Sequence, residues 1–111
     1  MISTHVLDLS SGKPASGLFV ALTRVKGEDR TPLASGVTDA DGRIKNVGKK
    51  GGRIGAGVYE LTFETGPYFA SKGVRSFHPV VTITIGIRDA SQNYHVPLLL
   101  SPFGYTTYRG S

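Results

Sequence analysis

The sequence predicts an all-β domain, most simply a sandwich of two antiparallel sheets with one short helix. Fifteen glycines and six prolines are spread over 111 residues, and many short segments between them alternate apolar with polar side chains. Alternation with a period of two is typical of strands that have one buried and one solvated face, and Gly, Pro and Asp end such strands in turns. A chain of this length fits one domain, spanning residues 1–111, without internal repeat or linker.

The first half of the chain predicts three strands separated by polar turns. The strands are expected at residues 2–9, 18–25 and 34–38, with a turn at 10–16 and a polar connection at 26–32. A tight turn is expected at Asp39-Ala40-Asp41-Gly42, because Asp and Gly suit its backbone angles. Residues 43–57 are rich in glycine but contain no phosphate-binding glycine pattern. We interpret Arg43–Gly57 as a mobile or edge-lying loop, within which Asn46–Gly55 matches no known pattern.

The second half predicts four more strands and the helix. Val58–Thr65 alternates cleanly, which favours a strand with one wet face. Gly66-Pro67 opens a short helix at 68–74, because proline suits the first helical turn. The remaining segments are strands at 77–87, 93–100 and 105–111, a polar turn at 88–92 and a break at Ser101-Pro102-Phe103-Gly104.

Composition narrows the possible classes of protein. The net charge is +5, but Lys and Arg are spread along the chain, so a nucleic-acid partner is not expected and a small anionic substrate is compatible. The chain has no cysteine, which excludes disulfides and thiolate metal sites. Its first residues show neither the basic nor the apolar region of a signal peptide, so none is expected, and no stretch approaches the ~18 apolar residues of a membrane helix. A cytoplasmic protein without membrane contact is the expectation.

The three histidines are the first candidates for chemistry. His5, His78 and His95 form no H-x-H or H-E-x-x-H pair, so their spacing indicates no metal site. His5 shares a strand face with Ser3, and alternation alone favours a hydrogen-bonded histidine at the sheet surface. His95 alternates with Pro97, which cannot donate to a sheet ladder and so indicates an edge or a bulge nearby. His78 is expected at the surface.

Other catalytic patterns are missing from the sequence. There is no G-x-S-x-G elbow for a serine nucleophile. The carboxylates of the turns and the polar strand faces form no pair of the kind a glycosidase needs; they are Asp8, Asp39, Asp41, Glu60 and Glu64. The residues by themselves therefore predict a β-sandwich with candidate histidines and no defined reaction.

Three motifs then occur in order along the chain. They are Ser3-Thr4-His5-Val6-Leu7-Asp8 with Ser11-Gly12-Lys13-Pro14-Ala15, then Thr38-Asp39-Ala40-Asp41-Gly42-Arg43, then the run from Tyr94 to Ser111. Over residues 3–111 they resemble the transthyretin-like 5-hydroxyisourate hydrolases. The final Tyr108-Arg109-Gly110-Ser111 is the mark that separates these enzymes from the vertebrate hormone carrier of the same fold. The family often has His where Asn93 stands, and Tyr and Ser where Phe103 and Thr106 stand, which leaves the chemical positions intact.

The resemblance implies a transthyretin-like (prealbumin-like) β-sandwich that hydrolyses 5-hydroxyisourate in urate breakdown. The product would be 2-oxo-4-hydroxy-4-carboxy-5-ureidoimidazoline. It also implies a homotetramer, a dimer of dimers with active sites between subunits, and no metal or organic cofactor.

The family's catalytic residues map onto His5, Arg43, His95 and Ser111, and Tyr108 joins His5, Arg43 and Ser111 in binding substrate. A histidine titrates near neutral pH and can take a proton from water, so His95 or His5 is the base, the other orienting water or substrate. The guanidinium of Arg43 can hold an anionic substrate and its oxyanion. Ser111 and its neighbours would close the site.

Two other functions compete with hydrolysis. A transthyretin-like carrier of a small aromatic ligand would share the fold, but it would not need His5, Arg43, His95 and the Tyr-Arg-Gly-Ser motif together. A basic structural or nucleic-acid-binding sandwich would bind polyanions in a salt-sensitive way and would show no turnover.

Overall fold

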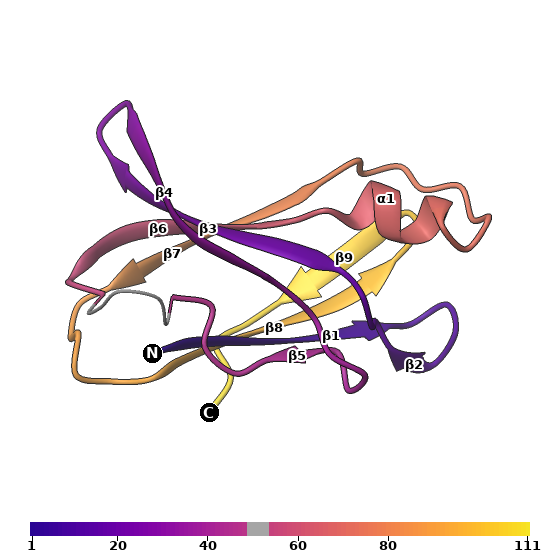
Figure 1. Cartoon of the computed structure of the whole chain (residues 1–111), viewed down its shortest axis with the longest axis horizontal. Coiled ribbons are helices and arrows are strands. Elements are labelled where there is room, and N and C mark those ends of the chain that lie inside the picture. Colours follow the sequence, from indigo (N-terminus) through magenta and orange to yellow (C-terminus); the bar gives the residue numbers. More distant parts are fainter. Residues whose placement is uncertain (49–53) are drawn as a thin grey trace.

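The computed structural model describes residues 1–48 and 54–111 and shows two β-sheets stacked face to face, with one short helix at an end (Figure 1). The five-stranded sheet has the order β2-β1-β8-β9, and β5 also pairs with β1. Its strands are β1 (Ile2–Asp8), β2 (Lys13–Pro14), β5 (Arg43–Ile44), β8 (Tyr94–Ser101) and β9 (Gly104–Thr107). The four-stranded sheet has the order β4-β3-β6-β7. Its strands are β3 (Phe19–Lys26), β4 (Asp29–Val37), β6 (Gly57–Phe63) and β7 (Val81–Ile87), and the helix α1 spans Thr65–Ala70.

The hydrophobic core lies between the sheets and takes mainly alternate residues from β1, β3, β6, β7 and β8. Burying this apolar surface is the main favourable contribution to folding. The five-stranded sheet contributes the even-numbered residues of β1 and β8, namely Ile2, Thr4, Val6, Asp8, Tyr94, Val96, Leu98 and Leu100. The four-stranded sheet contributes large side chains that are almost fully buried, among them Leu22, Tyr59, Leu61 and Phe63. The odd-numbered residues of β1 and β8 therefore form an outer face, turned away from the core.

The predicted sandwich with one short helix is confirmed, and one strand pair departs from the antiparallel expectation. β1 and β8 run parallel, with Ser3 opposite His95 and His5 opposite Pro97. Alternation predicts a strand but carries no information about its direction, so the sequence pattern could not reveal this pair.

Other boundaries differ for identifiable reasons. The polar connection expected at 26–32 belongs mostly to β4, an edge strand that is solvated on both faces and so needs no apolar alternation. The helix begins at Thr65 rather than at residue 68 and ends at Ala70, with Pro67 in its first turn as expected. β7 begins at Val81 rather than 77. The loop expected at Arg43–Gly57 is wrong at its start, because Arg43–Ile44 forms β5 against β1. The part at residues 49–53 lies outside the described residues.

The described part of the chain contains no helix with the length and apolar character needed to cross a bilayer.

A buried carboxylate joins α1 to the end of β1. Asp8 is buried, and its Oδ2 accepts a hydrogen bond of 2.8 Å from the hydroxyl of Tyr68. Its Oδ1 accepts bonds from the Ser10 hydroxyl and backbone and from the Ser11 backbone. Burial alone would raise the pKa of the Asp8 carboxyl, but these hydrogen bonds outweigh it, and the pKa lies below its usual 3.8.

We expect Tyr68→Phe to lower the free energy of unfolding by about 1.5–3 kcal/mol at neutral pH, because it removes a hydrogen bond to a buried charge. The folded-state pKa of Asp8 is depressed, so its contribution is present above 3.8 and is lost as pH falls through the folded-state value. Urea denaturation at several pH values measures this. Tyr59→Phe is the matched control, because the Tyr59 hydroxyl donates to the neutral Gly55 carbonyl. Loss of that hydrogen bond should lower the free energy of unfolding by the same amount at every pH. An equal pH response in both variants would contradict the ionic role of Asp8.

Candidate active site

The outer face of the five-stranded sheet brings together three of the predicted site residues. In the antiparallel pair of β1 and β5, His5 lies opposite Arg43. In the parallel pair of β1 and β8, Ser3 lies opposite His95. Since register partners project from the same side of a sheet, β1 places His5 beside Arg43 and Ser3 beside His95.

The tight turn before β5 fixes the backbone of Arg43. The Asp39 carboxylate accepts hydrogen bonds of 2.9 Å from the backbone N–H groups of Arg43 and Asp41, and the Asp39 N–H donates to the Arg43 carbonyl. Gly42 has a φ of 75°, and a Cβ there would lie 2.4 Å from the Val6 carbonyl oxygen, so only glycine fits. The expected turn at 39–42 is thereby confirmed, and it presents the Arg43 side chain at the edge of β1.

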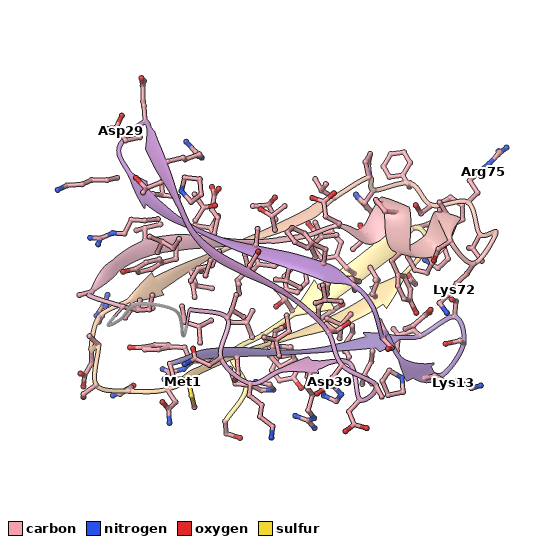
Figure 2. The ribbon with its side chains drawn as sticks, viewed as in Figure 1. Met1, Lys13, Asp29, Asp39, Lys72 and Arg75 are labelled. Atoms are coloured by element: carbon pink, nitrogen blue, oxygen red, sulfur yellow. The ribbon has the colours of Figure 1, made fainter. Side chains whose placement is uncertain are left out.

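Ser3, Arg43 and His95 border an open cavity of about 520 Å³ on the outer face. Figure 2 shows side chains of this face projecting away from the four-stranded sheet between the labelled Met1 and Asp39. The lining residues are Met1, Ser3, Thr4, Arg43, Ile44, Lys45, Asn93, His95 and Ser111. They include two cationic side chains, Arg43 and Lys45, and no Asp or Glu, so the cavity suits an anion.

His95 is held on two sides of its ring. Nδ1 lies 2.8 Å from the hydroxyl oxygen of Ser3. At the opposite edge, a Cβ built on Gly110 would lie only 2.5 Å from Cδ2, so the Gly110 backbone packs directly against the ring. Burial lowers the pKa of His95 below its usual 6.5, and Coulombic interactions with Arg43 and His5 lower it further. His95 is therefore a neutral imidazole at physiological pH.

Pro97 marks a gap in the pairing between β8 and the end of the chain. β9 pairs with β8 up to Leu98 and Thr107, and the pairing resumes at His95 and Gly110, where the Gly110 N–H donates to the His95 carbonyl at 2.8 Å. Two residues intervene on each side, so the register is kept. The proline has no N–H to donate there, and its carbonyl accepts a bond from the Thr107 hydroxyl instead. The edge or bulge expected near Pro97 is therefore wrong, because β8 lies between β1 and β9 in unshifted register and the proline is accommodated by a local gap in the pairing.

Not every predicted site residue lines the cavity. Arg43, His95 and Ser111 do, whereas His5 lies on the same face beside Arg43 without contributing to the lining. Tyr108 is exposed and borders a separate cavity of about 310 Å³ near Ile83 and Tyr94, so its role in binding substrate stays a prediction.

The third histidine, His78, does not line this cavity. The ring of His78 lies edge-on to Phe77 and Tyr105. Among the described residues, no three His, Cys, Asp or Glu side chains gather as a metal ion would require.

Sequence reasoning missed Ser3 and Lys45 as site residues. Lys45 follows Arg43 by two positions, so alternation along β5 was a usable signal for it. Alternation predicts that Ser3 shares a strand face with His5. Its contact with His95, however, depends on the parallel pairing of two strands, which brings together residues 92 positions apart in the sequence. Nothing in the local pattern reveals that contact.

The comparisons with known proteins identify the family of this chain. Residues 2–110 match the HIUase/Transthyretin family. The chain belongs to this family. Within it, the 5-hydroxyisourate hydrolase 2 of Rhizobium meliloti is 46% identical over 114 aligned positions, which cover 99% of this chain and 95% of that protein.

Two solved structures of similar proteins show that the backbone alone does not distinguish a hydrolase from a carrier. The 5-hydroxyisourate hydrolase of Klebsiella pneumoniae has a TM-score of 0.86 and 42% identity, over 99% of this chain and 98% of that one. Sea bream transthyretin in complex with thyroxine has a TM-score of 0.90 and 32% identity, over 98% and 93%. Because the backbone matches the carrier at least as well as the hydrolase, the functional conclusion depends on the side chains of the outer face.

Proposed function

We propose that this chain hydrolyses 5-hydroxyisourate to 2-oxo-4-hydroxy-4-carboxy-5-ureidoimidazoline in urate breakdown. The observation that carries the proposal is a hydrogen-bonded His95 in a cationic cavity bordered by Arg43, where burial lowers the pKa of the imidazole. A neutral imidazole can accept a proton from water, and a guanidinium can stabilise the negative charge that develops on a carbonyl oxygen. The identity to named 5-hydroxyisourate hydrolases supports the same reaction.

The proposed reaction is a general-base hydrolysis of a ring amide. Nε2 of His95 takes a proton from water while the water oxygen bonds to the ring carbonyl carbon. The Arg43 guanidinium holds the oxyanion that forms. The carbon–nitrogen bond of the ring then breaks, and the leaving nitrogen takes the proton back from the His95 imidazolium. Cleavage of a ring amide leaves a carboxylate and a ureido group, which are the groups of the named product.

We assign the base to His95 rather than to His5. His95 lines the cavity, and a hydrogen bond orients its ring. His5 lies opposite Arg43 across the β1–β5 pair, so its role is to orient the guanidinium or the substrate. Ser111 closes one side of the cavity.

The working form in this proposal is a homotetramer, a dimer of dimers. In one chain the cavity is open and lies on an exposed sheet face, which leaves the reacting groups in water. A second copy on this face would exclude water and strengthen the electrostatic interactions within the site.

A specific observation favours one alternative, a carrier of a small aromatic ligand. The backbone matches thyroxine-bound sea bream transthyretin at least as well as the hydrolase, with TM-scores of 0.90 and 0.86, although the sequence identity is lower, 32% against 42%. A carrier, however, has no need of a neutral histidine held beside an arginine.

Turnover of freshly made 5-hydroxyisourate decides between the two. Ultraviolet absorbance should show the substrate disappearing far faster with the protein than without it, and the same preparation should sediment as a tetramer. A decay rate equal to that of the buffer, together with saturable binding of an aromatic ligand, would favour the carrier. Full activity in a monomer would contradict the proposed assembly.

A further inference from the structure

We propose that Ser3 is a positioning residue for this reaction, because its hydroxyl oxygen accepts the Nδ1 proton of His95 and leaves Nε2 free to accept a proton from water. The inference rests on the proposed function of the same site and adds a residue to it.

The backbone brings the two side chains together. Ser3 and His95 are register partners in the parallel pair of β1 and β8, and both are half-buried on the outer face. The distance between Ser3 Oγ and His95 Nδ1 is 2.8 Å, which is a good hydrogen bond. The Gly110 backbone packs against the Cδ2 edge of the same ring. No described residue bonds to Nε2, so Ser3 and Gly110 hold the ring while that nitrogen stays free.

The direction of the hydrogen bond follows from the chemistry. A neutral imidazole carries one proton, and the hydrogen bond at one nitrogen decides whether the other is a base. If Ser3 donated to Nδ1, the ring proton would sit on Nε2, which could not then accept one. Once water is deprotonated, both ring nitrogens carry protons, and Nδ1 can only donate. An accepting Ser3 makes the same bond before and after the transfer, so it need not reorganise during the reaction.

A serine suits this position better than a carboxylate because of the surrounding charges. Arg43 and His5 act electrostatically on His95, and the charged or terminal residues that line the same cavity are Met1, Lys45 and Ser111. A carboxylate beside Nδ1 would favour the imidazolium and raise the pKa of His95. The neutral hydroxyl orients the ring without that effect, so the base stays unprotonated at physiological pH.

The experiment compares Ser3→Ala and Ser3→Thr, with Ser35→Ala on the four-stranded sheet as the matched control. Ser3→Ala should lower kcat by about tenfold to a hundredfold, as removal of an orienting hydrogen bond to a functional histidine does, with little change in KM. Ser3→Thr keeps a hydroxyl on a strand residue and should recover most of that loss. The control should behave like the wild type.

Two further measurements separate positioning from general structural damage. Nitrogen-15 spectra of labelled histidine should show His95 protonated on Nδ1 in the wild type and shifted toward protonation on Nε2 in Ser3→Ala. In Ser3→Asp the acid limb of the rate–pH profile should move to higher pH, because a carboxylate raises the pKa of the base.

Each outcome has a distinct meaning. If the wild-type enzyme turns over the substrate and Ser3→Ala keeps the full kcat, the role of Ser3 is overturned. The proposed function then still stands. A wild-type protein without turnover overturns the proposed function, and its histidine spectrum still tests the hydrogen bond. Protonation of wild-type His95 on Nε2 overturns the inference even if Ser3→Ala fails to fold.

Discussion

Replacing His95 with alanine should lower kcat/KM for 5-hydroxyisourate by about two to four orders of magnitude while leaving the fold and the assembly intact. A positioned general base contributes a factor of this size. The side chain lies on the outer face of the five-stranded sheet, half-buried and outside the core, so its loss removes chemistry and little packing. Stopped-flow absorbance gives the rate constants, and circular dichroism and sedimentation monitor the fold and the assembly.

The pH profile makes this test specific to His95. Because its pKa lies below 6.5, the neutral base should persist into mildly acidic solution, and wild-type turnover should fall only below that value. The acid limb should be missing from the residual activity of His95→Ala. His78→Ala is the matched control, because His78 contacts Phe77 and Tyr105 and does not line the cavity. If His95→Ala keeps wild-type rates, the base is another group, and His5 is the next to test.

Gly110→Val should abolish most turnover at nearly unchanged thermal stability. An added Cβ would lie 2.5 Å from Cδ2 of His95 and 3.2 Å from Cγ of Pro97, so the histidine ring or the chain end must move. A displacement of about 1 Å at a reacting group costs on the order of a hundredfold in rate. Gly110 lies outside the hydrophobic core, so the melting temperature should shift little.

The control for Gly110 is a glycine in the same part of the chain. At Gly104 an added Cβ would meet only the Ser101 hydroxyl, at 3.9 Å, which is ordinary van der Waals contact. Gly104→Ala should therefore keep its activity. A Gly110→Val protein with normal turnover would mean that the chain end is not part of the working site. Unfolding of that variant alone would assign Gly110 a structural role.

Much of the fold could be predicted because alternation reports burial directly. Val58–Thr65 alternates as a half-buried strand should, and β6 occupies most of that range. The strand predicted at residues 34–38 is too short, since β4 spans Asp29–Val37. A solvated edge strand carries no such alternation, and its polar residues resemble a turn. The parallel direction of β1 and β8 has no local signature at all.

The site was predictable only in part, for a related reason. Alternation put His5 and Ser3 on one face of a strand, and the family resemblance added Arg43 and Ser111. Neither says which strands are neighbours, so the contact between Ser3 and His95 emerged only from the folded chain. The lowered pKa of His95 likewise depends on burial and on charges from other strands.

The parallel pairing of β1 with β8 also affects how the protein is made. Ser3 and His95 are separated by 92 residues, so at usual translation rates β1 is synthesised roughly five to eighteen seconds before its neighbour. Throughout that interval one edge of β1 presents unpaired backbone groups, which other nascent chains can bind. Pairings this distant in sequence also form slowly after release from the ribosome. A chain interrupted before β8 therefore lacks both the strand that covers this edge of β1 and His95, so it carries an exposed strand edge and an incomplete candidate site.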